Sequence, residues 1–286
     1  MADRSVVIIG LPASGKTTFL AALWHLITMR DVPTVLAFGD LCVGDAAHLN
    51  VISGRWREAK IQDRTAPSGN HMVSMNLVDA SGQPLRVTFP DLPGEAYQQM
   101  CEERVCETDV AKVIQTGDVI LFVHADTIRA PQWVLDEVSL SRALGIGVPE
   151  AAAVPWHPRL APTQVQLVDL LQLLRRPPLD IGPRRLVVML SAWDKARGEG
   201  LTPGAYLAAK LPLLNQYLRR GADGWTWRVY GVSAQGGEYD PIDAATARVP
   251  EAEHLRSLDR PSTRIQLVGE GTDTHDLTEP LAWLMR

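Results

Sequence analysis

The stretch SVVIIGLPASGKTTFLAALW, residues 5–24, decides the fold. Four of its first five residues, at 6–9, are apolar and β-branched, which predicts a buried strand over 5–9. Residues 10–17 follow the pattern G-x-x-x-x-G-K-T, and an apolar helix is expected from Lys16 to about Met29. Strand, glycine loop and helix in this order form a cradle for phosphate, because loop N–H groups and the helix N-terminus attract anions. The expected phosphate contacts are Gly10, Pro12, Ala13, Ser14, Gly15, Lys16, Thr17 and Thr18.

Two side chains of this P-loop have distinct predicted roles. The Lys16 ammonium is expected to reach the β- and γ-phosphates of a nucleotide, where it also makes Lys16 a catalytic candidate. The Thr17 hydroxyl is expected to ligate Mg²⁺. The predicted ligands are therefore a nucleotide and Mg²⁺.

The composition excludes several classes of protein. The chain has 286 residues, is 46% hydrophobic and carries a net charge of −5, which is ordinary for a globular protein and argues against general nucleic-acid binding. No apolar run reaches the roughly 20 residues of a membrane helix, and no signal peptide precedes the first strand. The cysteines at 42, 101 and 106 show no metal-ligand spacing, so free thiols in a cytoplasmic protein are expected.

The periodicity of the rest of the chain predicts alternating strands and helices. The 71–89 hairpin makes one strand antiparallel, and the continuous apolar strands that follow are typical of a parallel sheet covered on both faces. Residues 34–60 are expected to form one or two short helices, with a further short helix possible over 132–144. Further strands are expected over 71–78, 84–89, 118–125, 185–190 and 225–232, with a short extra strand over 264–268. Further helices are expected over 96–115, 163–174 with Thr163 as its cap, 203–219 and 278–285.

This order predicts a doubly wound, mostly parallel α/β sheet with one antiparallel strand. A single domain is expected to span residues 1–286. Insertions on the frame are expected at about 30–70, 127–162 and 238–275, with residues 238–262 irregular.

Two further motifs follow predicted strands, at the edge where ligands meet an open α/β sheet. In DLPG, residues 91–94, the Asp91 carboxylate is suited to the Mg²⁺ shell and the Gly94 N–H to the γ-phosphate. In SAWD, residues 191–194, the Asp194 carboxylate can accept hydrogen bonds from guanine N1–H and its 2-amino group. Adenine lacks that pattern, so an unmatched carboxylate penalises it. The backbone of Ser233-Ala234, after the next strand, can meet guanine O6.

Together these motifs resemble the translation-factor-related, Ras-like P-loop GTPases, whose pattern is a P-loop, Asp-x-x-Gly, [Asn/Thr]-Lys-x-Asp and Ser-Ala-x. Ser191 replaces the Asn or Thr of the third motif and Ala192 its Lys. Trp193 or Lys195 are the candidates to supply stacking or charge instead.

The resemblance also implies switch residues. A threonine ahead of the hairpin should sense the γ-phosphate and ligate Mg²⁺; Thr65 is the candidate and Thr34 the alternative. Arg64 is a candidate internal arginine finger. Glu95 stands where many relatives carry a water-orienting Gln, which implies slow intrinsic hydrolysis raised by a partner.

More narrowly, residues 6–24, the DLPGE run and LTEPLAWL at 277–284 resemble bacterial double-GTPase proteins of conflict or defence systems. That resemblance implies a protein partner, either a second GTPase or an associated effector. Two alternatives stay open. One is a small-molecule kinase, with an arginine lid drawn from Arg175, Arg176, Arg184 and Arg185. The other is a nucleotide-binding scaffold without turnover.

Overall fold

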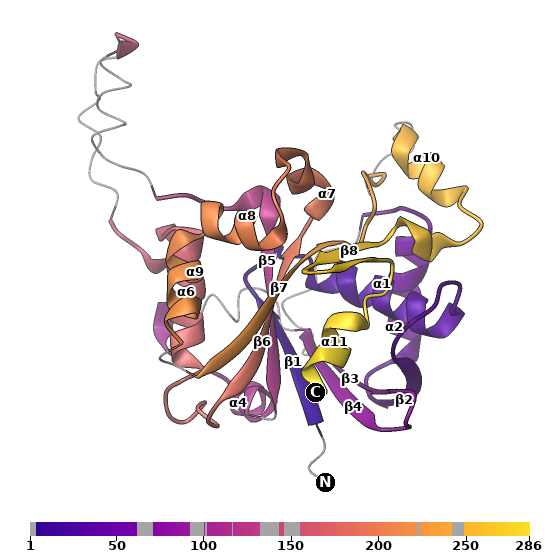
Figure 1. Cartoon of the computed structure of the whole chain (residues 1–286), viewed down its shortest axis with the longest axis horizontal. Coiled ribbons are helices and arrows are strands. Elements are labelled where there is room, and N and C mark those ends of the chain that lie inside the picture. The colour runs from indigo at the N-terminus through magenta and orange to yellow at the C-terminus, as the bar shows by residue number, and fades with distance from the viewer. Residues whose placement is uncertain are drawn as a thin grey trace.

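A nine-stranded sheet forms the centre of the computed structural model (Figure 1). The structure describes residues 4–61, 71–91, 100, 102–115, 117–131, 143–145, 155–221, 224–241 and 249–286. The strand order is β2-β3-β4-β1-β5-β6-β7-β8-β9. The strands are β1 (Arg4–Gly10), β2 (Ala37–Val43), β3 (His71–Val78), β4 (Pro84–Asp91), β5 (Asp118–His124), β6 (Arg184–Ser191), β7 (Trp225–Ser233), β8 (Gln266–Gly269) and β9 (Thr272–Thr274).

The central strands β4, β1, β5, β6 and β7 run parallel to one another. The predicted α/β class with a mostly parallel sheet is therefore confirmed. The 71–89 hairpin supplies the expected antiparallel strand, β3, and the described sheet contains a second one, β8. Because the central strands are parallel, their carboxyl ends share one edge of the sheet, and the predicted ligand-binding motifs meet there.

Helices cover both faces of the sheet (Figure 1). Alternate residues of β1 enter different cores: Val6 and Ile8 pack with α1, α2 and α11, whereas Val7 and Ile9 pack with α4, α6, α8 and α9. None of the described helices combines the length and apolarity that crossing a bilayer requires. The helices are α1 (Lys16–Met29), α2 (Ala46–Arg57), α4 (Thr108–Ile114), α6 (Thr163–Leu173), α7 (Trp193–Ala196), α8 (Pro203–Lys210), α9 (Pro212–Arg220), α10 (Pro250–Arg256) and α11 (Glu279–Leu284).

The segment 34–60 differs from the helical prediction. Residues 37–43 form β2, which pairs with β3, and only 46–57 are helical. Phe38 lies edge-on to Trp24 of α1, with ring centroids 5.4 Å apart. Strand pairing and this packing are long-range interactions that local propensity does not report.

The 238–275 segment is also more regular than predicted. Residues 250–256 form α10, which begins with Pro250 in the first turn, and β9 extends the sheet beyond the expected strand. Ala252 and Leu255 of α10 are buried in the same core as α1. The described parts of the predicted insertions at 30–70 and 238–275 therefore pack against the α/β frame.

Three predicted helix boundaries were wrong. The expected 203–219 helix is two helices, because Leu211 leaves the helical region ahead of Pro212. Residues 104–107 are not helical, so α4 begins only at Thr108. Thr163 is the first residue of α6 and makes no capping bond; its hydroxyl instead accepts a hydrogen bond from the Arg129 N–H at 2.9 Å.

The buried imidazole of His25 in α1 predicts a loss of stability in mild acid. His25 is 4% exposed and its Nε2 has no hydrogen-bond partner among the described residues. Burial lowers the pKa of His25 below its usual 6.5, although Asp31 opposes that effect and Arg264 and Arg57 add to it. The unfolded chain therefore binds this proton more readily, and stability falls as the pH drops below 6.5.

We expect His25→Gln to flatten the dependence of the unfolding free energy on pH between about 6.5 and 5. Urea unfolding across that range measures the slope. His254→Gln, at an exposed position on α10, is the matched control and should keep the wild-type slope. Equal slopes in both variants would contradict a buried neutral His25.

Candidate nucleotide-binding site

Close packing fixes the two glycines of the P-loop. A Cβ on Gly10 would lie 2.7 Å from the Phe122 carbonyl oxygen and from Ser14 Oγ. Gly15, with φ of +88°, precedes α1, and a Cβ there would lie 3.1 Å from Ser191 Oγ. Side chains at these positions would force the loop away from β5 and β6, so both positions require glycine.

The Lys16 ammonium lies inside the loop. Its Nζ donates to the carbonyl oxygens of Gly10 at 2.9 Å and Leu11 at 3.1 Å, and to Ser14 Oγ at 3.3 Å. Thr17 and Thr18 lie half-buried in the first turn of α1. The loop thus holds a cation and a helix N-terminus together, which suits the phosphates of a nucleotide.

The tip of the loop is exposed. Pro12 and Ala13 both lie at the surface, and Ala13 takes a φ of +55°. A left-handed residue turns the chain sharply ahead of the buried Ser14, so that the backbone of the loop curves around the start of α1.

Ser191 joins the P-loop to the third motif. The Ser191 hydroxyl, at the end of β6, donates to the Ser14 carbonyl oxygen at 2.8 Å, and it lies 3.4 Å from the carbonyl oxygen of Val123 on β5. It is buried at 6% exposure. Serine in place of the larger Asn or Thr therefore still provides a side-chain hydrogen-bond donor that fixes the loop.

The predicted base-reading residues are brought together. Ser233 Oγ donates to Asp194 Oδ1 at 2.7 Å and accepts the Gly236 N–H at 3.2 Å. The carbonyl of Ala234 accepts a hydrogen bond from the indole of Trp56 at 2.7 Å, which fixes the orientation of that loop. Asp194 stays half-buried and keeps acceptor capacity on its carboxylate.

The suggestion that Trp193 stacks on a base was wrong. Trp193 is 2% exposed, lies edge-on to Tyr206 at 5.3 Å, and packs on Gly231, where a Cβ would be 2.3 Å from its ring. Lys195 is half-exposed and its Nζ lies 3.4 Å from Asp126 Oδ2. Lys195 is thus the charge available beside Asp194, whereas Trp193 is core.

The remaining switch residues are placed only in part. Asp91 is the last residue of β4, at the same sheet edge as the P-loop. Thr17 and Asp91 are both hard oxygen donors of the kind that Mg²⁺ prefers, so the residue types fit that metal. The predicted Arg64, Thr65, Gly94 and Glu95 lie outside the described residues.

Thr34 lies at the wrong end of α1 for the switch role. The neighbouring Val35 N–H donates to Asp276 Oδ2 at 2.6 Å, and the Leu36 N–H donates to Thr278 Oγ1 at 3.0 Å. Thr34 follows the 14-residue helix α1, about 20 Å long, whose other end carries the P-loop.

The arginines considered for a kinase lid have structural roles. Arg184, at 3% exposure, starts β6 and donates to the carbonyl oxygens of Ile114 and Leu179. Arg175 pairs with Asp180 at 2.6 Å. Arg184 and Ser191 stand at opposite ends of an eight-residue strand, so these arginines lie at the edge of the sheet away from the P-loop.

His124 is a candidate site residue that no sequence motif marks. It ends β5 at the ligand-binding edge, and its Nδ1 is buried without a hydrogen-bond partner in the described part of the chain. Burial lowers its pKa, with Asp126 opposing and Lys195 reinforcing that shift. The rule that selected Asp91, a polar residue ending an apolar strand, would also have selected His124.

Three features define the class of this protein as P-loop GTPases. They are the P-loop at the end of β1, the hydrogen bond that links it to the end of β6, and the Asp194–Ser233 pair after β6 and β7. The chain belongs to the Double-GTPase 1 family, whose model matches residues 7–284. The resemblance to double-GTPase proteins is thereby confirmed.

Several solved structures also align with the chain. The bacterial selenocysteine-specific elongation factor EF-Sec is 13% identical with a TM-score of 0.40, and the alignment covers 83% of this chain and 27% of that one. The structure of sup35 complexed with GDP is 15% identical with a TM-score of 0.36, and the alignment covers 90% of this chain and 45% of that one. The signal recognition particle receptor SRb-GTP/SRX complex from Chaetomium thermophilum is 12% identical with a TM-score of 0.37, and the alignment covers 90% of this chain and 96% of that one. The chain thus spans about a quarter of the elongation factor. No curated protein matches it.

The Ser191 link predicts a selective loss of nucleotide affinity. Ser191→Ala removes the hydrogen bond to the Ser14 carbonyl, a net loss of about 1 kcal/mol, which corresponds to roughly fivefold weaker GDP binding if the loop loosens. Calorimetric titration with GDP measures the change.

Ser74→Ala is the matched control, because its buried hydroxyl bonds Thr88 Oγ1 at 3.2 Å in the β3–β4 hairpin. Both variants should lower the melting temperature, but only Ser191→Ala should weaken GDP. Equal GDP affinities in the two variants would rule out the positioning role of Ser191.

Proposed function

We propose that this protein binds GTP with Mg²⁺ and hydrolyses it to GDP and phosphate. Two hydrogen bonds at one edge of the sheet support this proposal most directly. Ser191 donates to the Ser14 carbonyl of the P-loop, and Ser233 donates to the Asp194 carboxylate. A carboxylate at the same edge of the sheet as the phosphate cradle can accept the two N–H groups of guanine. The family membership supports the same assignment.

The proposed roles follow the charges that hydrolysis develops. Lys16 and the P-loop N–H groups stabilise the β- and γ-phosphate oxygens, and Thr17, Thr65 and Asp91 hold Mg²⁺ or its water shell. Gly94 contacts the γ-phosphate. Mg²⁺ would supply neutralisation of the phosphate charge.

We further propose that hydrolysis is slow without a partner. Glu95 places a carboxylate where many relatives have a neutral water-orienting residue, and Arg64 is the proposed internal cation. The absence of the motif lysine at Ala192 also favours a second candidate function, a nucleotide-binding scaffold without turnover.

In the cell, we propose a nucleotide-dependent switch acting as one domain within a multi-protein system of the bacterial defence type. The partner is a second GTPase or an associated effector. The free thiols of Cys42 and Cys106 suit the reducing cytoplasm, while Cys101 lies outside the described residues. The net charge of −5 argues against direct nucleic-acid binding.

Calorimetry with GTP, GDP and ATP, followed by phosphate release without an acceptor, tests the proposal. We expect GTP and GDP to bind at least tenfold tighter than ATP, because adenine leaves the Asp194 carboxylate unmatched. We also expect Mg²⁺-dependent phosphate release from GTP. Tighter ATP binding would overturn the guanine assignment, and GTP binding without release would favour the scaffold.

Asp194→Asn should change the preferred base. The amide offers an N–H where the carboxylate offered an oxygen, so GTP affinity should fall at least tenfold while xanthosine triphosphate binds better than to wild type. Competition titrations with the two triphosphates measure the ratio. Asp126→Asn, which changes the neighbouring carboxylate beside Lys195, is the control and should leave the preference for GTP.

A further inference from the structure

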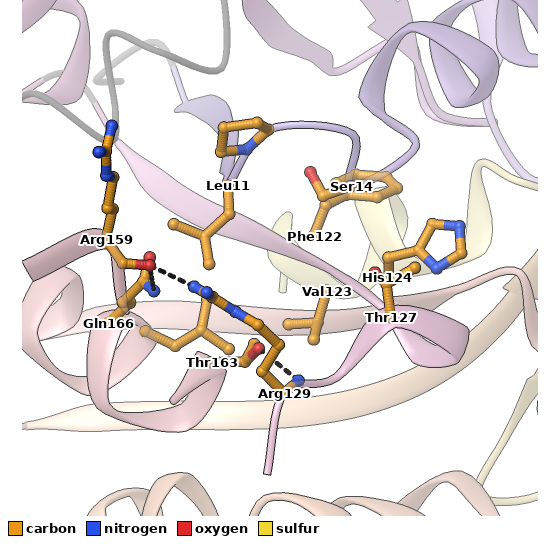
Figure 2. Close-up of a pocket in the computed structure, with 12 residues that line it drawn as sticks. Leu11, Ser14, Phe122, Val123, His124, Thr127, Arg129, Arg159, Thr163 and Gln166 are labelled. Carbon is orange, nitrogen blue, oxygen red and sulfur yellow. Dashed lines mark hydrogen bonds between the residues drawn. The ribbon is translucent and has the colours of Figure 1, made fainter. Parts of the chain in front are cut away.

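A pocket of about 210 Å³ opens beside the P-loop, between the ends of β1 and β5 and the start of α6 (Figure 2). Leu11, Pro12 and Ser14 form its loop wall. Arg129 and Arg159 come from the other side, within the segment expected as an insertion. The pocket therefore shares a wall with the proposed phosphate site without being the nucleotide site itself.

The backbone that carries Arg159 is held in place. The Arg129 guanidinium donates to the carbonyl oxygens of Arg159 and Ala161, and Gln166 Nε2 donates to the Ala161 carbonyl at 2.8 Å. Thr163 Oγ1 accepts the Arg129 N–H at 2.9 Å. Figure 2 shows the Arg129 side chain, from the segment after β5, reaching towards the Arg159 carbonyl. The rim of the pocket is a pre-organised structure.

The two arginines differ in what binds them. Arg129 uses its guanidinium on carbonyl oxygens, which satisfies N–H groups without neutralising its charge. The Arg159 guanidinium forms no hydrogen bond or ion pair within the described ranges, and Figure 2 shows it standing beside the loop residue Leu11. Within the described part of the chain, Arg159 is thus an exposed cation with unused donors on a fixed backbone.

No carboxylate lies among the described residues that line the pocket. The first turn of α6, an 11-residue helix, adds the positive end of a helix dipole through Thr163 and Gln166. His124 also lines the pocket, with its buried Nδ1 unpartnered among the described residues. Two cations and a helix N-terminus suit a small anion that carries several acceptor oxygens.

We propose that this pocket binds inorganic phosphate and receives the phosphate released by GTP hydrolysis, with Arg159 as its main ligand. The role as a product site rests on the proposed function. Hydrogenphosphate has the charge and the acceptor oxygens for Arg159 and Arg129. Because Leu11, Pro12 and Ser14 line the pocket, it lies next to the loop that is proposed to hold the γ-phosphate.

Titration of the protein with inorganic phosphate, with and without saturating GDP and Mg²⁺, tests the site. Arg159→Ala should weaken phosphate binding to the GDP-loaded protein about tenfold or more, as expected for a lost charge-assisted hydrogen bond, and should change GDP affinity less than twofold. Arg176→Ala, at an exposed position beyond the far end of α6, is the matched control and should match wild type.

A single-turnover experiment separates the chemical step from release. Arg159→Ala should leave the rate of GTP cleavage in acid-quenched samples unchanged. Because phosphate is held less tightly, the variant should shorten the delay between cleavage and the detection of free phosphate. Equal phosphate affinities in Arg159→Ala and Arg176→Ala, or no phosphate binding by the wild type, would overturn the site. If GDP does not bind, the proposed function fails, but Arg159-dependent phosphate binding without nucleotide would still establish the pocket as an anion site.

Discussion

The contact between the Ser191 hydroxyl and the Ser14 carbonyl oxygen is the interaction on which the site depends. It requires β6 to lie beside β5, β5 beside β1, and the loop to approach closely enough that only glycine fits at position 15. Each of these conditions follows from parallel strands whose carboxyl ends share an edge. Because the P-loop and the Asp194 loop are joined there, displacement of either is transmitted to the other.

The sequence predicted the central sheet because its strands are continuous apolar runs. Residues 118–125 and 185–190 can be buried on both faces only within a covered parallel sheet, so hydrophobicity alone identifies them. The edge strand β2 was not predicted, because it contains no such apolar run. β2 has a mixed pattern, with Gly39 and Asp40 at its middle, and it is a strand because it pairs with β3.

The candidate site likewise combines residues that lie in short sequence motifs with residues that only the fold brings together. Lys16, Asp194 and Ser233 were identified because each belongs to a short local pattern at a strand end. The pocket was not, since Arg129 and Arg159 are separated by 30 residues and come together only through a hydrogen bond to a carbonyl. Trp193 was misjudged because an aromatic residue beside a base-reading carboxylate is ambiguous until its burial is known; Gly231 beneath it leaves the room that makes it core.

A second set of contacts connects the guanine loop with the segment that leads to the predicted switch. Trp56 of α2 bonds the Ala234 carbonyl, and the backbone of Ala59 and Ile61 brackets Asp240 with hydrogen bonds of 2.9 and 3.1 Å. Asp240 is further held by Arg256 of α10 at 2.6 Å. The chain is therefore fixed as far as Ile61, immediately before the residues in which the γ-phosphate sensor is expected. α2 and α10, which were expected as irregular or inserted segments, thus anchor the chain just before the predicted switch to the loop that is proposed to read the base.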